Sequence, residues 1–178
     1  WLKAEIIREA NRPVDLLLGI ICNGYFKFRS FNSGLEGQEK IDIKTGDNLT
    51  ESIIDLLKKD DSRKLIFLKS RRDTINAAFK LAASANWGEA SATINGLDGE
   101  EASFLIRALR QTLSRGVAFH NADLTSSQRT AIEQGYLSGE INVIFTTTTL
   151  AMGANLPAEL VLLETMKYSD GEPRRTSW

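Results

Sequence analysis

The sequence has little of several residues on which other protein classes depend. Its single cysteine, Cys22, excludes an internal disulfide framework, and with His120 as the sole histidine we expect no zinc or other metal site. No apolar run approaches the ~18 residues that a membrane span needs, and no basic-then-apolar leader is present. We therefore expect a cytoplasmic protein with no membrane partner.

The charge is also balanced, without an excess of either sign. The 22 Lys and Arg residues nearly match the 23 Asp and Glu residues, which gives a net charge of −1. Because the chain has no overall positive charge to attract nucleic acid, any contact with nucleic acid has to come from a local group of residues. The 178 residues are 42% hydrophobic and 25% charged, a globular composition with enough length for a real core. These values exclude a disordered chain, a coiled coil and a collagen-like chain.

The first third of the chain has the patterns of extended structure. Residues 16–21 form a short apolar run, and residues 25–29 alternate between side-chain types with a period of two. Residues 32–40, rich in Gly, Ser and Glu, are typical of a loop. We predict a strand or hairpin appendage over residues 12–43, within an opening segment that spans residues 1–47.

From residue 48 onward, helix and strand patterns alternate. Short apolar segments predict strands at residues 64–68, 117–119, 141–145 and 160–163. Pairs of capping-box type predict the starts of three helices: Asn48 with Glu51, Asp98 with Glu101, and Thr125 with Gln128. Strands separated by helices imply right-handed crossovers and a parallel sheet. The predicted fold class is α/β, an open parallel sheet with helices on both faces, over residues 48–178.

Three polar clusters follow predicted strands of this sheet. They are Ser70-Arg71-Arg72, His120-Asn121-Ala122-Asp123 and the four threonines at 146–149. In an open parallel sheet, ligands sit outside the carboxyl ends of the strands. Each cluster also precedes or opens a helix, whose free N–H groups attract anions. The three clusters together predict an edge that binds a phosphate backbone.

Each candidate also has an alternative that is purely structural. Ser70 is in a position to cap the next helix, and an arginine pair is often a solvated helix start. A lone histidine after an apolar strand is often structural, and threonines often continue a strand. Gly153 could form a simple turn. Arg129 and Glu133, one helical turn apart, are spaced for an ion pair.

Motifs that would complete a catalytic site are missing from the chain. It has no G-x-x-x-x-G-K-[ST] or G-x-G-x-x-G loop, no D-E-x-[DH] motif and no nucleophile elbow. If this domain takes part in catalysis, it completes a site whose main parts lie elsewhere.

Residues 116–163 resemble the second RecA-like lobe of a superfamily-2 helicase, and more narrowly the superkiller-type group. Residues 64–74 resemble helicase motif IV, with Phe67 and Ser70 in the expected places, and residues 1–19 resemble the passage between lobes in archaeal DNA-repair helicases. Within residues 116–163, the positions that match the family pattern are His120, Ala122, Leu124, Arg129, Glu133, Thr147, Thr149–Ala151, Gly153 and Asn155–Ala158. The chain departs from the family pattern at Asn121, where the family has histidine, and at Asp123, where it has glycine.

The resemblance implies a motor that grips one nucleic-acid strand and is driven by ATP and Mg²⁺ in the full-length protein. It implies backbone contacts by Ser70, Arg71, His120 and Thr147, with a phosphate-facing role as the alternative to the ion pair for Arg129. Gly153 and Asn155 match the part of motif V that faces the nucleotide cleft.

The partners implied are a first RecA-like lobe and single-stranded or partly duplex nucleic acid, with DNA favoured over RNA. The family's motif VI, which carries an arginine finger, would follow residue 178, so we expect this chain alone to bind ATP poorly and to be inactive.

Two other functions remain open at this point. One is a non-catalytic scaffold that uses a helicase-like lobe to bind protein partners. The other is an unrelated nucleotide-dependent α/β enzyme, which the lack of any phosphate loop disfavours.

Overall fold

The structure, a computed structural model, describes residues 13–22, 24–41, 49–99, 103–148, 150 and 156–164. The chain divides into two compact units, Trp1–Leu56 and Leu57–Trp178, and each is described by itself. No helix within the described ranges is long and apolar enough to cross a membrane.

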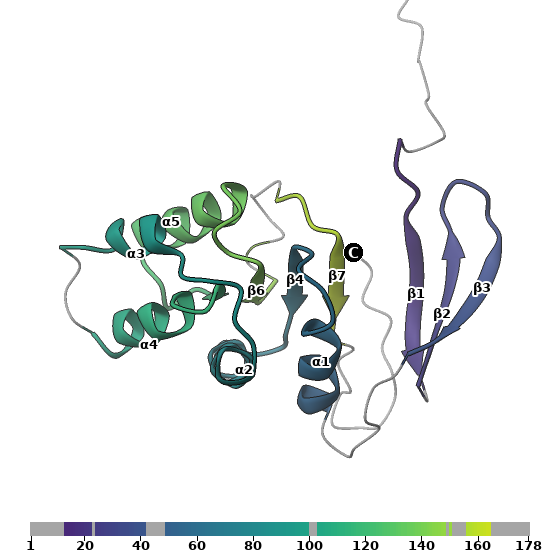
Figure 1. Ribbon diagram of the computed structural model, residues 1–178, viewed down its shortest axis with the longest axis horizontal. Helices are drawn as coiled ribbons and strands as arrows, with labels where there is room; N and C mark the ends of the chain where they lie inside the picture. The colour runs from purple at the N-terminus through teal and green to yellow at the C-terminus, as the bar shows by residue number, and fades with distance from the viewer. Residues whose placement is uncertain are drawn as a thin grey trace, which may run out of the picture. The chain divides into compact units, whose positions relative to one another are not determined.

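The first unit contains an antiparallel sheet of three strands (Figure 1). The strands, in spatial order, are β1 (Leu17–Cys22), β2 (Tyr25–Ser30) and β3 (Glu36–Lys40), and helix α1 (Leu49–Leu57) follows them in the chain. The predicted strand or hairpin appendage is therefore confirmed. The prediction of a loop over residues 32–40 is wrong in its second half, because β3 forms there.

Glycines beneath aromatic rings explain why the polar segment 36–40 pairs as a strand. Phe28 of β2 lies opposite Gly19 of β1 and Gly37 of β3. A Cβ atom on Gly37 would lie 2.7 Å from Cζ of Phe28, so the ring occupies the space that a side chain would take. The rings of Phe26 and Phe28 are stacked with centroids 5.3 Å apart. Cross-strand packing of this kind stabilises a strand whose own residues have low strand propensity.

The second unit is a parallel sheet of four strands in the order β5-β6-β4-β7. The strands are β4 (Lys64–Phe67), β5 (Val117–His120), β6 (Val143–Thr146) and β7 (Leu160–Leu163). The helices are α2 (Arg71–Ser84), α3 (Ser91–Asn95), α4 (Phe104–Leu113) and α5 (Ser126–Leu137). The predicted open α/β fold with a RecA-like parallel sheet is confirmed.

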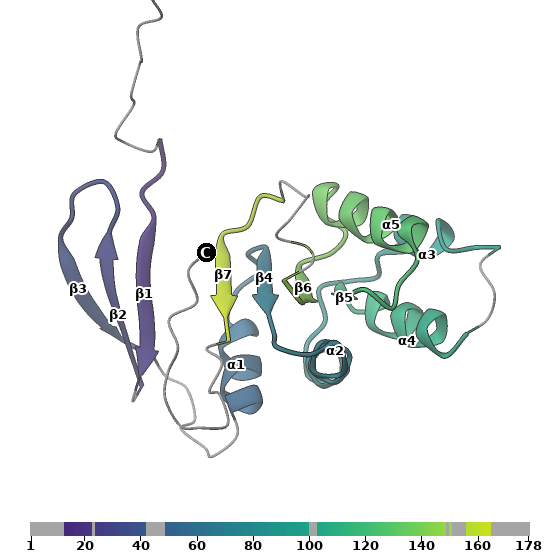
Figure 2. The ribbon, with the colours of Figure 1, turned by 180° about the vertical axis from the view of Figure 1, so that it is seen from behind.

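The order of the strands distributes the helices over both faces of this sheet. The chain crosses from β4 past β6 to β5 through α2 and α4, and returns from β5 to β6 through α5. Right-handed crossovers in opposite directions place their helices on opposite faces. Figures 1 and 2 show this arrangement, with α5 on one side of the strands and α2 and α4 on the other.

The core of the second unit lies between the sheet and these helices. Fully buried side chains include Ile66, Phe119 and Phe145 of the strands, Leu81 of α2 and Ile132 of α5. Every residue of β5 and β6 is buried, as expected for the two adjacent strands of a parallel sheet that is covered on both faces.

A buried lysine lies at the amino end of this sheet, away from the carboxyl edge. The ammonium of Lys64 lies 2.6 Å from Oδ1 of Asp60 and donates to the carbonyls of Asp60 and Ser62, each at 2.8 Å. It also lies 5.6 Å from the ring centroid of Trp87. The hydrogen bonds from Lys64 and Ser62 lower the pKa of Asp60 to about 2. Every donor of this ammonium is therefore satisfied, as a buried charge requires.

Helix starts were only partly predicted. Thr125 caps α5 through a complete capping box with Gln128, as predicted. The prediction that Asp98 caps the helix carrying Phe104 is wrong, because Ser103 is the N-cap of α4 and Asp98 instead pairs with Arg110 at 2.8 Å. The predicted cap Asn48 lies outside the described residues.

Helix α3 was not predicted, and a distant carboxylate stabilises it. Glu140 accepts hydrogen bonds from the backbone N–H groups of Ala92 and Thr93, at 3.1 and 2.9 Å, and from the Thr93 hydroxyl at 2.9 Å. These bonds satisfy free donors in the first turn of a short helix. The residue that supplies them follows α5 in the chain, so local sequence gives no sign of it.

Candidate nucleic-acid interface

The ends of three strands meet at one edge of the parallel sheet. Thr146 at the end of β6 lies opposite Phe67 of β4 on one side and opposite His120 of β5 on the other. Leu68 continues the pairing by donating its N–H to the carbonyl of Thr146 at 2.8 Å. The polar clusters that follow these strands therefore start from adjacent points of the carboxyl edge, as the sequence predicted.

Ser70 and Arg71 form the start of α2. The Ser70 hydroxyl accepts from the backbone N–H of Asp73 at 3.1 Å and donates to its carboxylate at 2.6 Å, so the capping alternative for Ser70 is present in the structure. Arg71 reaches across to Asp123, and its guanidinium pairs with that carboxylate. Arg71 is thus an ion-paired charge at the edge, and its side chain remains 57% exposed.

His120 lies beneath the edge rather than on its surface. The residue is 2% exposed, and its Nε2 lies 3.0 Å from Oε1 of Glu133 on α5. Burial lowers the pKa of His120, and this effect outweighs the opposing influence of the Glu133 carboxylate. Nδ1 has no hydrogen-bond partner among the described residues. This geometry supports the structural alternative, in which a neutral His120 donates to Glu133 and fixes α5 against the sheet.

The predicted ion pair between Arg129 and Glu133 is wrong. The Glu133 carboxylate is turned toward His120, and no ion pair of Arg129 occurs within the part of the chain that the structure describes. The guanidinium of Arg129 is half-buried on α5 and lies close enough to His120 to contribute to lowering its pKa. A cation without a carboxylate partner at this edge is suited to bind an external anion.

Thr147 is the first residue after β6 and is half-buried. Its carbonyl accepts a hydrogen bond from the Thr146 hydroxyl at 3.0 Å, and the next residue, Thr148, is exposed. The structure thus brings Thr147 to the same edge as Ser70 and Arg71. The two residues predicted for the nucleotide cleft, Gly153 and Asn155, lie outside the described residues.

The sequence placed Asn121 in the second polar cluster but not among the individual contact residues. The fully buried amide of Asn121 donates to the Thr74 hydroxyl at 3.0 Å and to the Arg71 carbonyl at 3.4 Å, while its oxygen accepts from the N–H of Asp123 at 3.0 Å. One side chain therefore joins the end of β5 to the start of α2. The departure from the family pattern at 121 and 123 was the available signal, but these contacts link residues ~50 positions apart.

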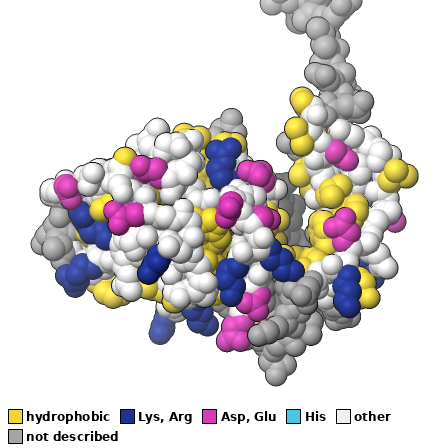
Figure 3. Space-filling view, viewed as in Figure 1, with side chains coloured by type: hydrophobic (Ala, Val, Ile, Leu, Met, Phe, Trp, Pro, Cys, Tyr) yellow, Lys and Arg dark blue, Asp and Glu magenta, His cyan; other side chains and the backbone are white. Residues whose placement is uncertain are grey.

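The electrostatic character of the edge is mixed. Lys69 pairs with Glu164 beyond β7 at 3.7 Å, and its backbone N–H donates to the same carboxylate at 3.1 Å. Figure 3 shows Lys and Arg side chains spread over the face in view, with Asp and Glu side chains between them. This mixture of positive and negative side chains agrees with the near-neutral composition of the whole chain.

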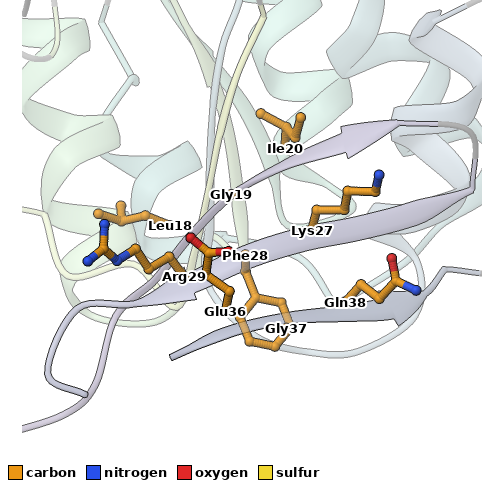
Figure 4. A pocket seen from close by; sticks show the side chains of 9 residues that line it. All are labelled: Leu18, Gly19, Ile20, Lys27, Phe28, Arg29, Glu36, Gly37 and Gln38. Carbon is orange, nitrogen blue, oxygen red and sulfur yellow. The ribbon is translucent and has the colours of Figure 1, made fainter. Parts of the chain in front are cut away.

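A shallow hollow on the three-stranded sheet contains none of the predicted site residues. Figure 4 shows its lining, in which β1 contributes apolar side chains, β2 contributes a phenylalanine between two basic side chains, and β3 contributes polar side chains. The lining residues are Leu18, Gly19, Ile20, Lys27, Phe28, Arg29, Glu36, Gly37 and Gln38. Within the described ranges, no group of His, Cys, Asp or Glu residues is arranged to hold a metal ion.

Comparison with known proteins gives relatives over almost the whole chain. No protein-family model matches it. The chain is 32% identical over 96% of its length to the ATP-dependent DNA helicase Hel308 of Caldivirga maquilingensis, and 33% identical over 96% to that of Thermoplasma volcanium. It is 34% identical over 62% of its length to the DExH-box ATP-dependent RNA helicase DExH14 of Arabidopsis thaliana, and covers 5% of that protein. The chain spans 23% of each Hel308 protein, about a quarter of its length.

Proposed function

Because the homologues of this chain are superfamily-2 helicases of the superkiller-type group, we propose that it supplies the second RecA-like motor lobe of an ATP-dependent helicase. The lobe comprises residues 48–178, and residues 1–47 form its connection to a first lobe. The observation that carries this proposal is that the strands ending at Phe67, His120 and Thr146, each followed or closed by a polar cluster, end side by side at one edge of a parallel sheet. A strand backbone bound along this edge would contact all three clusters.

The residues of the edge have different roles in this proposal. The Arg71 and Arg129 guanidinium groups and the Thr147 hydroxyl hold backbone phosphates. The Ser70 hydroxyl, which donates to Asp73 in the structure, binds a phosphate by exchanging that hydrogen bond. His120, which is buried against Glu133, positions α5 and with it Arg129. Contacts of this kind do not depend on base sequence, because phosphates carry no base information.

ATP with Mg²⁺ supplies the energy in the full-length protein, and this chain provides one wall of the nucleotide site. Gly153 and Asn155 are the residues proposed to face that site. The lysine loop and the carboxylate motif that phosphoryl transfer requires are absent from this sequence, so a first lobe has to supply them. The chain alone should therefore show no ATP hydrolysis above background in an assay with single-stranded DNA or RNA.

The proposed partner is single-stranded or partly duplex nucleic acid, with DNA favoured. Relatives named as DNA helicases match 96% of the chain, whereas the RNA helicase DExH14 matches 62% of it. This difference in coverage supports DNA, because the longer matches include the opening segment as well as the parallel sheet.

The proposal is tested by Thr147→Ala in the full-length protein. We expect weaker single-strand binding and slower unwinding with an unchanged melting temperature, since a half-buried threonine at the edge contributes little to the core. Ser84→Ala, which removes an exposed hydroxyl in the last turn of α2, is the matched control and should change neither property.

A second variant separates the nucleotide site from the edge. Asn155→Ala should lower nucleic-acid-stimulated ATP turnover more than it lowers single-strand affinity. Unchanged unwinding and affinity in Thr147→Ala would instead favour the alternative, a non-catalytic scaffold for protein partners.

A further inference from the structure

We propose that Asp123 competes with the nucleic-acid backbone for Arg71 and thereby limits how tightly this edge holds a strand. The inference rests on the proposed function, since it concerns the same edge of the sheet. Its basis is the ion pair between the Arg71 guanidinium and the Asp123 carboxylate. Their side chains are 57% and 37% exposed, so solvent, and with it a phosphate, reaches the pair.

The pair is held in place by a buried framework. Asn121 donates to the backbone carbonyl of Arg71 and accepts from the backbone N–H of Asp123. Its second contact, to the Thr74 hydroxyl, fixes the first turn of α2 in the same position. The backbones of both partners are thus anchored by one fully buried side chain. Less conformational entropy is therefore lost when Arg71 and Asp123 pair than when two flexible surface chains meet.

A carboxylate and a phosphate use the same donors of an arginine. Both accept charge-assisted hydrogen bonds from the guanidinium fork. A backbone phosphate therefore binds Arg71 only by replacing Asp123, whose charge then lies beside that of the phosphate. Arg129, the other arginine proposed to hold a phosphate, has no carboxylate partner among the described residues, so of these two arginines only Arg71 is subject to this competition. A motor has to release its strand repeatedly, and one weakened contact makes this release easier.

The test is Asp123→Asn, which removes the charge and preserves the shape of the side chain. Binding of a fluorescein-labelled single-stranded DNA to the full chain is measured by anisotropy over a range of salt concentrations. We expect about fivefold tighter binding, equivalent to about 1 kcal/mol, the upper value for an exposed ion pair. The slope of log affinity against log salt should steepen by up to about one, since one more phosphate contact forms without competition. Asp123→Gly, which lacks the carboxylate altogether, should shift affinity in the same direction.

Two controls identify Arg71 as the site of the effect. In an Arg71→Ala background, Asp123→Asn should change affinity by less than about 1.5-fold, because double-mutant cycles isolate the coupling between two residues. Asp98→Asn removes a similar Asp–Arg pair, with Arg110 in the last turn of α4, and should leave affinity unchanged.

Three outcomes would overturn the inference. Equal tightening with and without Arg71 would mean a general charge effect. No tightening in Asp123→Asn or Asp123→Gly, together with weaker binding in Thr147→Ala, would refute the competition and leave the proposed function standing. No binding by the wild type or any variant would refute both.

Discussion

Gly135 of α5 offers the sharpest test of the packing that positions the edge. This helix carries Arg129 and Glu133, and it contacts α3 at Gly135. A Cβ atom added there would lie 2.0 Å from Oγ1 of Thr93, 3.0 Å from Cδ1 of Ile141 and 3.2 Å from Cβ of Thr93. No carbon and oxygen atoms approach to 2.0 Å without a bond, so Gly135→Ala requires Thr93 or the whole helix to move.

The expected change in the free energy of unfolding is the sum of one favourable and two unfavourable effects. Alanine is favoured over glycine inside a helix by about 1 kcal/mol. Against this, the Thr93 hydroxyl donates to the Glu140 carboxylate at 2.9 Å, and displacing it costs about 1.5–3 kcal/mol, as for other hydrogen bonds to charged groups. Overpacking of a tight contact adds about 1–3 kcal/mol. The expected net loss in the free energy of unfolding is about 1.5–5 kcal/mol.

Urea unfolding followed by circular dichroism measures this loss, with Gly96→Ala as the matched control. Gly96 follows α3 with φ −64° and ψ −14°, and the nearest atoms to an added Cβ lie at 3.4 and 3.5 Å. Gly96→Ala should therefore be neutral or stabilising by about 0.4–1 kcal/mol. In a Thr93→Ala background, the cost of Gly135→Ala should fall by at least about 1 kcal/mol. A Gly135→Ala variant as stable as Gly96→Ala would refute the close approach of α5 and α3.

Two further variants test the partner of a buried lysine and a buried hydroxyl. Asp60 has its pKa lowered to about 2 by Lys64 and Ser62, so its ionised form contributes stability above pH ~4 that is lost as pH falls toward 2. Because the Asp60 side chain is 63% exposed, we expect Asp60→Asn to cost only about 1 kcal/mol at pH 7, and urea unfolding should show this difference vanish near pH 2. The Tyr136 hydroxyl is buried without a hydrogen-bond partner among the described residues, and burial raises its pKa. Tyr136→Phe should therefore leave the midpoint of urea unfolding unchanged or higher, and a lower midpoint would reveal a partner for the hydroxyl.

The fold was predictable where its signals are local. The capping box of Thr125 and Gln128 lies within one helical turn, and each side chain accepts a hydrogen bond from the backbone N–H of the other residue. The start of α4 was missed because Asp98, a good capping residue by type, instead pairs with Arg110. Strand β3 was missed because its stability comes from Phe28 on the neighbouring strand rather than from its own polar residues.

The site was predictable to the level of the sheet edge and no further. Strand ends in a parallel sheet share one edge, so the convergence of the clusters follows from the order of elements alone. Which side chain pairs with which depends on contacts between distant segments. Glu133 lies one turn from Arg129 in the chain yet turns to His120, because β5 and α5 place that ring beside it. Arg71 and Asp123 meet for the same reason, through β5 and α2.

The central claim is that the carboxyl edge of the parallel sheet binds a nucleic-acid backbone. Its most direct test is a titration of the ¹⁵N-labelled chain with single-stranded DNA, followed through the backbone amide signals. The account predicts shifts at residues 69–72, 120–123 and 147–148 that weaken as salt is added, because phosphate contacts are screened and release counterions. Shifts centred instead on Lys64 and Asp60 at the amino end of the sheet, or no shifts at all, would contradict it.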